Sequence, residues 1–188
     1  MRHGFKTWAE NQAIEQRCNL GLAADAPLPA TQLASYLGIT IIGPEQIPGI
    51  SPGHLECLLQ RDRFSWSAIT VNVNKYTFII HNTGHTETRQ ESNLMHEMAH
   101  IICKHASARL IRIGELPFLL REYDPGQEEE ASWLGACLQL PRPALWWAVK
   151  HRMTQVEMMQ YFHASDDLIR FRRQVTGVDR QFSRLLAR

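Results

Sequence analysis

The chain has 188 residues, 44% of them hydrophobic and 21% charged, which is an ordinary balance for one globular domain. Twenty basic and nineteen acidic residues leave a formal charge of +1, so the composition argues against a strong overall attraction to nucleic acid. No apolar run reaches the roughly 20 residues of a membrane span, and the N-terminal residues show no apolar signal-peptide core.

The four cysteines, Cys18, Cys57, Cys103 and Cys137, lie far apart and form no Cys-x-x-Cys pair. Their spacing disfavours both a disulfide framework and a cysteine zinc site. We therefore expect a protein of a reducing cytoplasm, with no membrane partner.

The first half of the chain predicts short helices followed by strands. Apolar residues at helical spacing predict a helix over 5–20, and a shorter one over 30–37 ends at a glycine. A loop rich in glycine and proline is expected over 43–53. Apolar and β-branched runs predict strands at 39–42, 55–60, 68–73 and 76–81. We expect the last three of these strands to form an antiparallel meander, and so a small antiparallel sheet.

The second half of the chain is mainly helical. Thr88 and Glu91 have the spacing of a capping box just before an apolar run, which predicts a helix that continues to about His105. Residues 106–125 give a mixed pattern, and residues 127–140 predict the next helix, ended by a proline.

The C-terminal region predicts two short helices, 153–162 and 166–174, that resemble a helix-turn-helix. Ser165 or Asp166 is the expected cap of the second helix. Several arginines make this end basic, but the near-neutral overall charge favours a structural or partner-docking role over direct binding of DNA.

The pattern His96-Glu97-Met98-Ala99-His100 carries most of the functional information. Two histidines at positions i and i+4 lie on one helix face and can bind one zinc ion. The glutamate beside the first histidine can act as a general base on water that the metal activates. A helical wheel places both histidines at the edge of a continuous apolar arc, at the border between core and cleft.

A third ligand is expected to be a carboxylate from another part of the chain, as in His₂Glu zinc sites. Glu128, Glu129 and Glu130 open the helix predicted over 127–140. On the wheel Glu128 lies beside small residues that let another helix approach closely, Glu130 falls among larger apolar residues, and Glu129 points away. Wheel geometry alone favours Glu128 only slightly over Glu130.

Two further residues near the motif are candidates. Cys103 follows His100 by three residues and shares its face, so it is an alternative ligand, although a free buried cysteine is the commoner case. His105 follows His100 by five residues, which on a continuous helix places it on the opposite side. His105 is therefore rejected as a ligand.

Two segments resemble the ImmA/IrrE family of metallopeptidases. They are residues 93–102, with the His-Glu-x-x-His pattern, and residues 128–141, a Glu-x-x-Ala helix that ends in Leu-x-Leu-Pro. The resemblance extends over roughly residues 25–180. The family usually carries Asn or Asp at the position of Ser132, where a serine can still form a hydrogen bond to a metal ligand.

The resemblance implies an α+β fold: a zincin-like helical domain with a small antiparallel sheet against the active-site helix and a C-terminal helix-turn-helix-like segment. It implies one metallopeptidase domain over 1–188, with a catalytic core at 22–141 and a helical segment at 142–188. It also implies a gluzincin-like site in which His96, His100 and Glu128 bind the metal and Glu97 is the base.

The function implied is that of a cytoplasmic zinc-dependent endopeptidase, with Mn²⁺ as the alternative metal. Its substrate would be a specific regulatory protein, such as a helix-turn-helix repressor of a mobile element, a phage or a stress response. Tyr161, His163 and Arg172 are candidate oxyanion donors. By analogy of fold, an extended substrate could add to the sheet edge near Ala68–Val73.

Two other functions remain open at this point. The first is a non-catalytic binding module in which a structural metal, completed by Cys103, supports docking to a repressor or to DNA. The second is a toxin–antitoxin component that acts on its partner by proteolysis.

Overall fold

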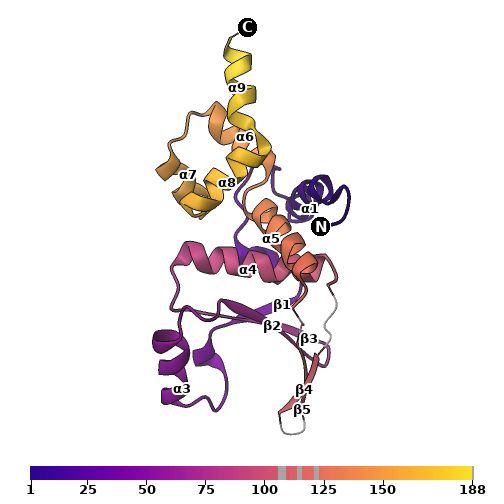
Figure 1. Cartoon of the computed structure of the whole chain (residues 1–188), viewed down its shortest axis with the longest axis vertical. Coiled ribbons are helices and arrows are strands. Elements are labelled where there is room, and N and C mark those ends of the chain that lie inside the picture. Colours follow the sequence, from indigo (N-terminus) through magenta and orange to yellow (C-terminus); the bar gives the residue numbers. More distant parts are fainter. Residues whose placement is uncertain (106–108, 114–115, 121–122, 188) are drawn as a thin grey trace.

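A computed structural model describes residues 1–105, 109–113, 116–120 and 123–187 of the chain. Figure 1 shows an elongated molecule with a sheet at one end, helices α4 and α5 at the centre and the C-terminal helices at the other end. The helices are α1 (Phe5–Asn19), α2 (Ala30–Tyr36), α3 (Pro52–Glu56), α4 (Glu87–Ile102), α5 (Pro125–Gln139), α6 (Arg142–Lys150), α7 (Gln155–Phe162), α8 (Asp166–Thr176) and α9 (Val178–Leu186). The strands are β1 (Ile39–Ile42), β2 (Ala68–Val73), β3 (Tyr76–His81), β4 (Arg109–Ile113) and β5 (Leu116–Leu120).

The strands form one mixed sheet in the order β1-β3-β2-β5-β4. Strands β2 and β3 form the predicted antiparallel hairpin, but β1 runs parallel to β3, so a purely antiparallel sheet was wrong. Parallel pairing needs a long crossover, and the chain between β1 and β3, which contains α3 and β2, is long enough to supply one. The predicted α+β class is confirmed.

The strand predicted over 55–60 is wrong, because this segment is helical. The Ser51 side chain accepts a hydrogen bond of 3.2 Å from the His54 backbone N–H, and Pro52 occupies the first helical turn of α3. Both residues favour a helix start at this point. A wider helical turn over Cys57–Arg61 then continues α3, so local capping outweighs the strand propensity of the apolar residues.

The capping box predicted from Thr88 and Glu91 is also absent from α4, which begins at Glu87 after Thr86. The Glu91 carboxylate instead accepts a hydrogen bond of 2.5 Å from the backbone N–H of Ala30, the first residue of α2. This contact satisfies one of the free donors at the start of α2. Burial raises the pKa of Glu91 above its usual value, although this hydrogen bond opposes the shift.

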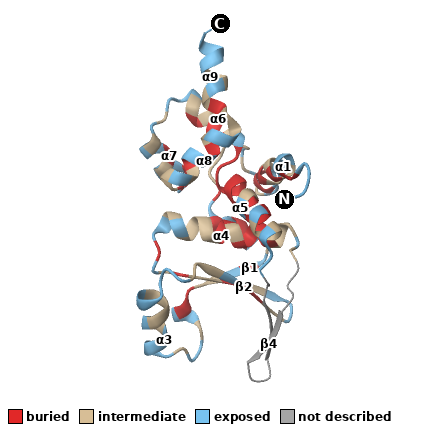
Figure 2. Cartoon of the chain, viewed as in Figure 1, coloured by how far each residue is buried: buried red, intermediate tan, exposed pale blue. Residues whose placement is uncertain are grey.

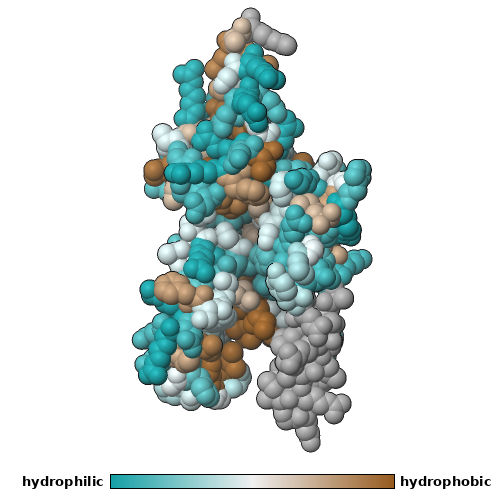
Figure 3. All heavy atoms as spheres, in the orientation of Figure 1, coloured by the Kyte–Doolittle hydropathy of each residue, from teal (hydrophilic) through white to brown (hydrophobic). Residues whose placement is uncertain are grey.

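Two hydrophobic clusters form the core (Figure 2). The first joins α1, α2, α4, α5 and one face of the sheet, and includes Met95, Met98, Leu134 and Leu138, all fully buried. Each such side chain stabilises the fold by about 1.5–3 kcal/mol relative to exposure. On the face shown in Figure 3, hydrophilic residues cover most of the helices and apolar residues gather beside α3.

The second cluster joins α6, α7, α8 and α9 and includes Leu145, Met158, Phe162 and Ile169. Ser165 caps α8 by accepting a hydrogen bond of 3.2 Å from the Leu168 backbone N–H, so the predicted cap is confirmed. None of the described helices is long and apolar enough to cross a membrane. The division into a core at 22–141 and a helical segment at 142–188 stays a prediction.

Helices α4 and α5 cross at Gly135. A Cβ atom added to Gly135 would lie only 3.2 Å from the Cα atom of His96 and from the carbonyl oxygen of Met95. Real Cβ atoms rarely come so close to backbone, so the absence of a side chain at Gly135 brings α5 against the part of α4 that carries the first histidine. The close helix approach expected from the small residues of α5 is therefore confirmed.

The C-terminal end of α5 is held by two fully buried arginines, Arg17 and Arg172. The Arg17 guanidinium donates a hydrogen bond of 2.9 Å to the carbonyl oxygen of Leu138, and Arg172 Nε donates one of 2.8 Å to that of Leu140. Burial lowers the pKa of Arg17 to about 10. Arg172 also forms an ion pair with Glu10 of α1, so this end of α5 lies where the two clusters meet.

Candidate metal centre

Three potential metal ligands come together between α4 and α5. His96 and His100 lie one turn apart on α4, and Glu128 lies in the first turn of α5. One ligand atom from each of these residues lies within 4.8 Å of the other two. His100 is 1% exposed, whereas the side chains of His96 and Glu128 are 28% and 27% exposed, so the cluster opens to solvent on one side.

The distances between these atoms fit one metal ion. His96 Nε2 lies 3.0 Å from His100 Nε2 and 3.1 Å from Glu128 Oε2, and His100 Nε2 lies 3.4 Å from Glu128 Oε1. Ligands about 2.1 Å from a tetrahedral zinc ion lie about 3.4 Å from one another. Two imidazole nitrogens and a carboxylate are also the donor set of catalytic His₂Glu zinc sites.

The two alternative ligands, Glu130 and Cys103, have other surroundings. Glu130 is 5% exposed, and its carboxylate pairs with Arg2 Nη2 at 2.8 Å and with His105 Nε2 at 3.4 Å. Burial alone would raise the pKa of Glu130, but hydrogen bonds from Arg2 outweigh burial and hold it below its usual value. Burial, helped by the charge of Glu130, raises the pKa of the Cys103 thiol to about 12, which disfavours the thiolate that a metal requires.

Glu97 points from α4 toward the sheet and is 5% exposed. The hydroxyl of Thr70 on β2 donates a hydrogen bond of 2.5 Å to Glu97 Oε2. This contact orients the carboxylate from the side of the sheet. Nothing in the local sequence around Thr70 indicates such a role, because the pairing of a β2 residue with α4 depends on how the sheet packs under the helix.

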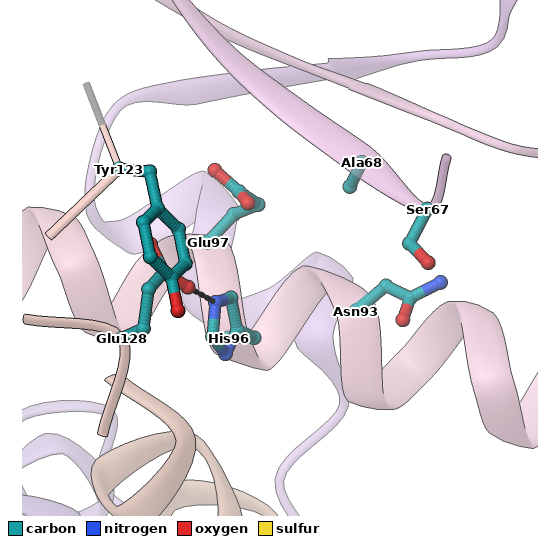
Figure 4. Close-up of a pocket in the computed structure, with 7 residues that line it drawn as sticks. All are labelled: Ser67, Ala68, Asn93, His96, Glu97, Tyr123 and Glu128. Carbon is teal, nitrogen blue, oxygen red and sulfur yellow. Dashed lines mark hydrogen bonds and ion pairs between the residues drawn. The ribbon is translucent and has the colours of Figure 1, made fainter. Parts of the chain in front are cut away.

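A cavity of about 330 Å³ opens beside the cluster (Figure 4). It is lined by residues from the start of β2 and the residue before it, from α4, and from α5 and the segment before α5: Ser67, Ala68, Asn93, His96, Glu97, Tyr123 and Glu128. Figure 4 shows the ring of Tyr123 beside the pair formed by His96 and Glu128, with Asn93 and Ser67 at the far side of the cavity. Tyr123 was missed by the sequence analysis, since it stands alone in a segment of mixed pattern.

Comparison with known protein families matches residues 58–173 to the model of peptidase family M78, described as the IrrE N-terminal-like domain. The chain belongs to this family. The match covers more than half of the chain and includes α4, α5 and the cavity. It confirms the resemblance to ImmA/IrrE metallopeptidases and supports a metallopeptidase-type function, which implies a metal cofactor and a protein substrate. Comparisons with curated proteins and with solved structures gave no match.

In this M78 chain Ser132 takes the position where the family usually has Asn or Asp. Its hydroxyl lies 3.5 Å from His96 Nδ1, at the limit of a hydrogen bond, and Ser132 is exposed. The serine therefore supports His96 only weakly, as the shorter side chain leads one to expect.

The structure does not bring the predicted oxyanion donors Tyr161, His163 and Arg172 to this cavity. Tyr161 stacks on Trp147 with ring centroids 5.2 Å apart, His163 ends α7 in a left-handed conformation, and Arg172 is fully buried against α5. All three belong to helices that pack into the second cluster, whereas the cavity lies against the first. Among the described residues that line the cavity, Tyr123 is the one with a phenolic hydroxyl.

Proposed function

We propose that this M78 peptidase is a zinc-dependent endopeptidase in which His96, His100 and Glu128 bind the metal and Glu97 is the general base. The observation that carries the proposal is the cluster of two imidazole nitrogens and one carboxylate, with edges of 3.0 to 3.4 Å, beside a cavity lined by Glu97. This donor set favours zinc, with Mn²⁺ as the alternative.

A bound zinc ion would supply Lewis acidity, which makes water a nucleophile at neutral pH and polarises a peptide carbonyl. Glu97 would take the proton of the attacking water at one carboxylate oxygen and deliver it to the nitrogen of the leaving amine. Thr70 would orient the Glu97 carboxylate for this proton transfer, because its hydroxyl donates a hydrogen bond to Glu97 Oε2.

Tyr123 is our candidate for the oxyanion donor. Its ring borders the cavity beside His96 and Glu128, and its hydroxyl can donate to a carbonyl oxygen that becomes negatively charged. The substrate would lie along the Ala68 end of β2, which lines the same cavity. The sheet edge expected over Ala68–Val73 is shortened, because β5 pairs with β2 at Asn72.

We propose that the substrate is one regulatory protein of the cytoplasm, such as a helix-turn-helix repressor. A cavity of about 330 Å³ holds few side chains, which supports narrow specificity. The arginines of α8 support a protein target over DNA. Arg170 pairs with Asp166 at 2.7 Å, Arg173 pairs with Asp179 at 2.8 Å, and Arg172 is fully buried.

The test compares the zinc-loaded wild-type chain with Glu97→Gln and Tyr123→Phe in a cytoplasmic lysate. New protein N-termini are identified by mass spectrometry, and zinc per chain is measured by elemental analysis. We expect one zinc per chain in all three proteins. The rate at which new N-termini form should fall about 10²–10⁴-fold in Glu97→Gln and about 10²–10³-fold in Tyr123→Phe.

Three results would count against this function. Cleavage by Glu97→Gln at the wild-type rate would remove Glu97 as the base. A wild-type chain that binds no zinc and no manganese would remove the metal site. Bound zinc with tight capture of one protein and no new N-terminus would favour a binding module with a structural metal.

A further inference from the structure

The chain that follows α4 folds back onto the last turn of this helix. The helix stops at Ile102, and Lys104 adopts a left-handed conformation with φ of 55°. The His105 backbone N–H donates to the carbonyl oxygen of His100 at 3.0 Å, and the Lys104 N–H donates to that of Ile101 at 3.0 Å. This is the Schellman motif, in which the residue after the left-handed position comes back beside the third residue from the helix end.

His105 is thereby brought against His100, and not to the opposite face as a continuous helix would require. His105 Nδ1 lies 2.8 Å from His100 Nδ1, with the two rings nearly perpendicular at 70°. On its other side, His105 Nε2 lies 3.4 Å from Glu130 Oε2. The His105 side chain is 6% exposed and that of Glu130 is 7% exposed, so water screens these contacts little.

Arg2 binds the carboxylate of Glu130. Its backbone N–H and its Nε each donate a hydrogen bond of 2.9 Å to Glu130 Oε1, and its Nη2 pairs with Oε2 at 2.8 Å. The contacts therefore run from Arg2 through Glu130 and His105 to His100. They involve neither of the Nε2 atoms of His96 and His100 that face Glu128.

The positions of the protons follow from these contacts. A carboxylate only accepts, so Glu130 favours the His105 tautomer with its proton on Nε2, and His105 Nδ1 then carries a lone pair. That lone pair accepts the Nδ1 proton of His100. His100 Nε2 is left without a proton, which is the form that a metal requires.

We propose that His105 and Glu130 are positioning residues that fix the tautomer and the ring orientation of His100 for metal binding. The inference rests on the proposed function for the identity of the site. It extends that function by assigning to Glu130, the third acidic residue of α5, a role distinct from ligation. Metal-binding histidines usually donate their other ring nitrogen to a carboxylate or a carbonyl, and here a second imidazole stands between the ligand and the carboxylate.

The first test uses the wild-type protein without metal. ¹⁵N NMR of the histidine rings reports the tautomer of His100, and an N–H···N hydrogen bond between the two Nδ1 atoms gives a scalar coupling across it. We expect the Nδ1-protonated tautomer of His100 and a measurable coupling to His105. An Nε2-protonated His100 without the coupling would overturn the proposal, whatever the metal content of the protein.

The second test measures zinc affinity by competition with a chromophoric chelator. We expect zinc to bind about 10–100-fold more weakly to His105→Ala and Glu130→Gln. His105→Asn should recover part of this loss, because its amide oxygen can take the position of Nδ1 as acceptor. The exposed residues His54 and Glu129 supply matched controls, and His54→Ala and Glu129→Gln should bind zinc within about 2-fold of wild type.

The results separate this proposal from the proposed function. Tight zinc binding that persists in His105→Ala and in Glu130→Gln would overturn the positioning role and leave the metal site intact. A wild-type chain that binds no zinc would overturn the proposed function, while the NMR measurement would still decide between the two tautomers of His100. Equal losses in the control variants would show a nonspecific effect and overturn the proposal.

Discussion

The two ends of α5 differ in what they bind. At the first turn, Glu128 faces the imidazoles of α4, and Glu130, two residues later, faces Arg2 and His105. At the last turn, two buried guanidinium groups bind the backbone carbonyl oxygens. Both ends complement the helix dipole, since acidic groups lie at the positive end and basic groups at the negative end.

This difference indicates that the first turn of α5 contributes to the candidate metal site, whereas its last turn contributes to the stability of the fold. The Glu128 carboxylate lies 3.1 Å from His96 Nε2 and 3.4 Å from His100 Nε2, an arrangement that a bound cation would stabilise. The arginines at the other end bind carbonyl oxygens that would otherwise be buried without donors. Substitutions at the two ends should therefore separate metal affinity from folding stability.

Glu128→Gln should give the largest effect on metal binding. Loss of a charged ligand should weaken zinc binding by more than about 100-fold, beyond the cost of losing an outer partner of a ligand. The free energy of unfolding of the metal-free protein should change little, because the Glu128 side chain is 27% exposed. Chelator competition and urea unfolding of the two proteins measure both quantities.

Glu129→Gln is the matched control for this substitution, since Glu129 is the exposed neighbour that pairs with the N-terminal amine. Zinc binding by Glu128→Gln at wild-type affinity would contradict the assignment of the third ligand.

Arg172→Met, unlike Glu128→Gln, should lower the stability of the protein and leave its zinc affinity almost unchanged. It removes a fully buried guanidinium from the carbonyl oxygen of Leu140 and from Glu10, and should lower the free energy of unfolding by about 3 kcal/mol. Zinc affinity of the folded protein should stay within about 2-fold of wild type, because the change lies at the far end of α5 from the metal ligands.

Arg170→Met removes an exposed arginine of α8 that pairs across one turn with Asp166, and should cost about 0.5 kcal/mol or less. If Arg172→Met and Arg170→Met lowered the free energy of unfolding equally in urea, the buried contacts of Arg172 would contribute no more to stability than an exposed ion pair.

Gly135→Ala tests the point between the two ends and should lower the free energy of unfolding less than Arg172→Met does. The added Cβ would meet the backbone of His96 at 3.2 Å, and such overpacking costs about 1–3 kcal/mol. A gain of about 1 kcal/mol in helix propensity offsets part of that cost. We expect a net loss of about 1 kcal/mol and weaker zinc binding, because His96 must shift.

Gly53→Ala is the control, because a Cβ at Gly53 of α3 meets nothing within 4 Å and should not destabilise the protein. A Gly135→Ala protein with wild-type stability and zinc affinity would mean that the crossing of α4 and α5 tolerates a methyl group.

Local sequence was sufficient for most of the helices and for the three central residues of the candidate site. The His-Glu-x-x-His pattern places His96, Glu97 and His100 on one stretch of helix, because positions i and i+4 share a face. Wheel geometry favoured Glu128 only slightly over Glu130, and the resemblance to the ImmA/IrrE family added support for Glu128. The structure brings Glu128 to the histidines and turns Glu130 to Arg2 and His105.

The sequence by itself determined the periodic features of this protein: the amphipathic α4 with its histidine pair, the small residues of α5 and the hairpin of β2 and β3. These follow from spacing along one element, which sequence records directly. Only the tertiary structure decided that β1 runs parallel to β3, that Glu91 caps α2, that Thr70 contacts Glu97 and that a left-handed Lys104 brings His105 back to His100. Each of these depends on partners distant in the sequence or on a backbone conformation that lysine seldom adopts, and neither leaves a periodic signal.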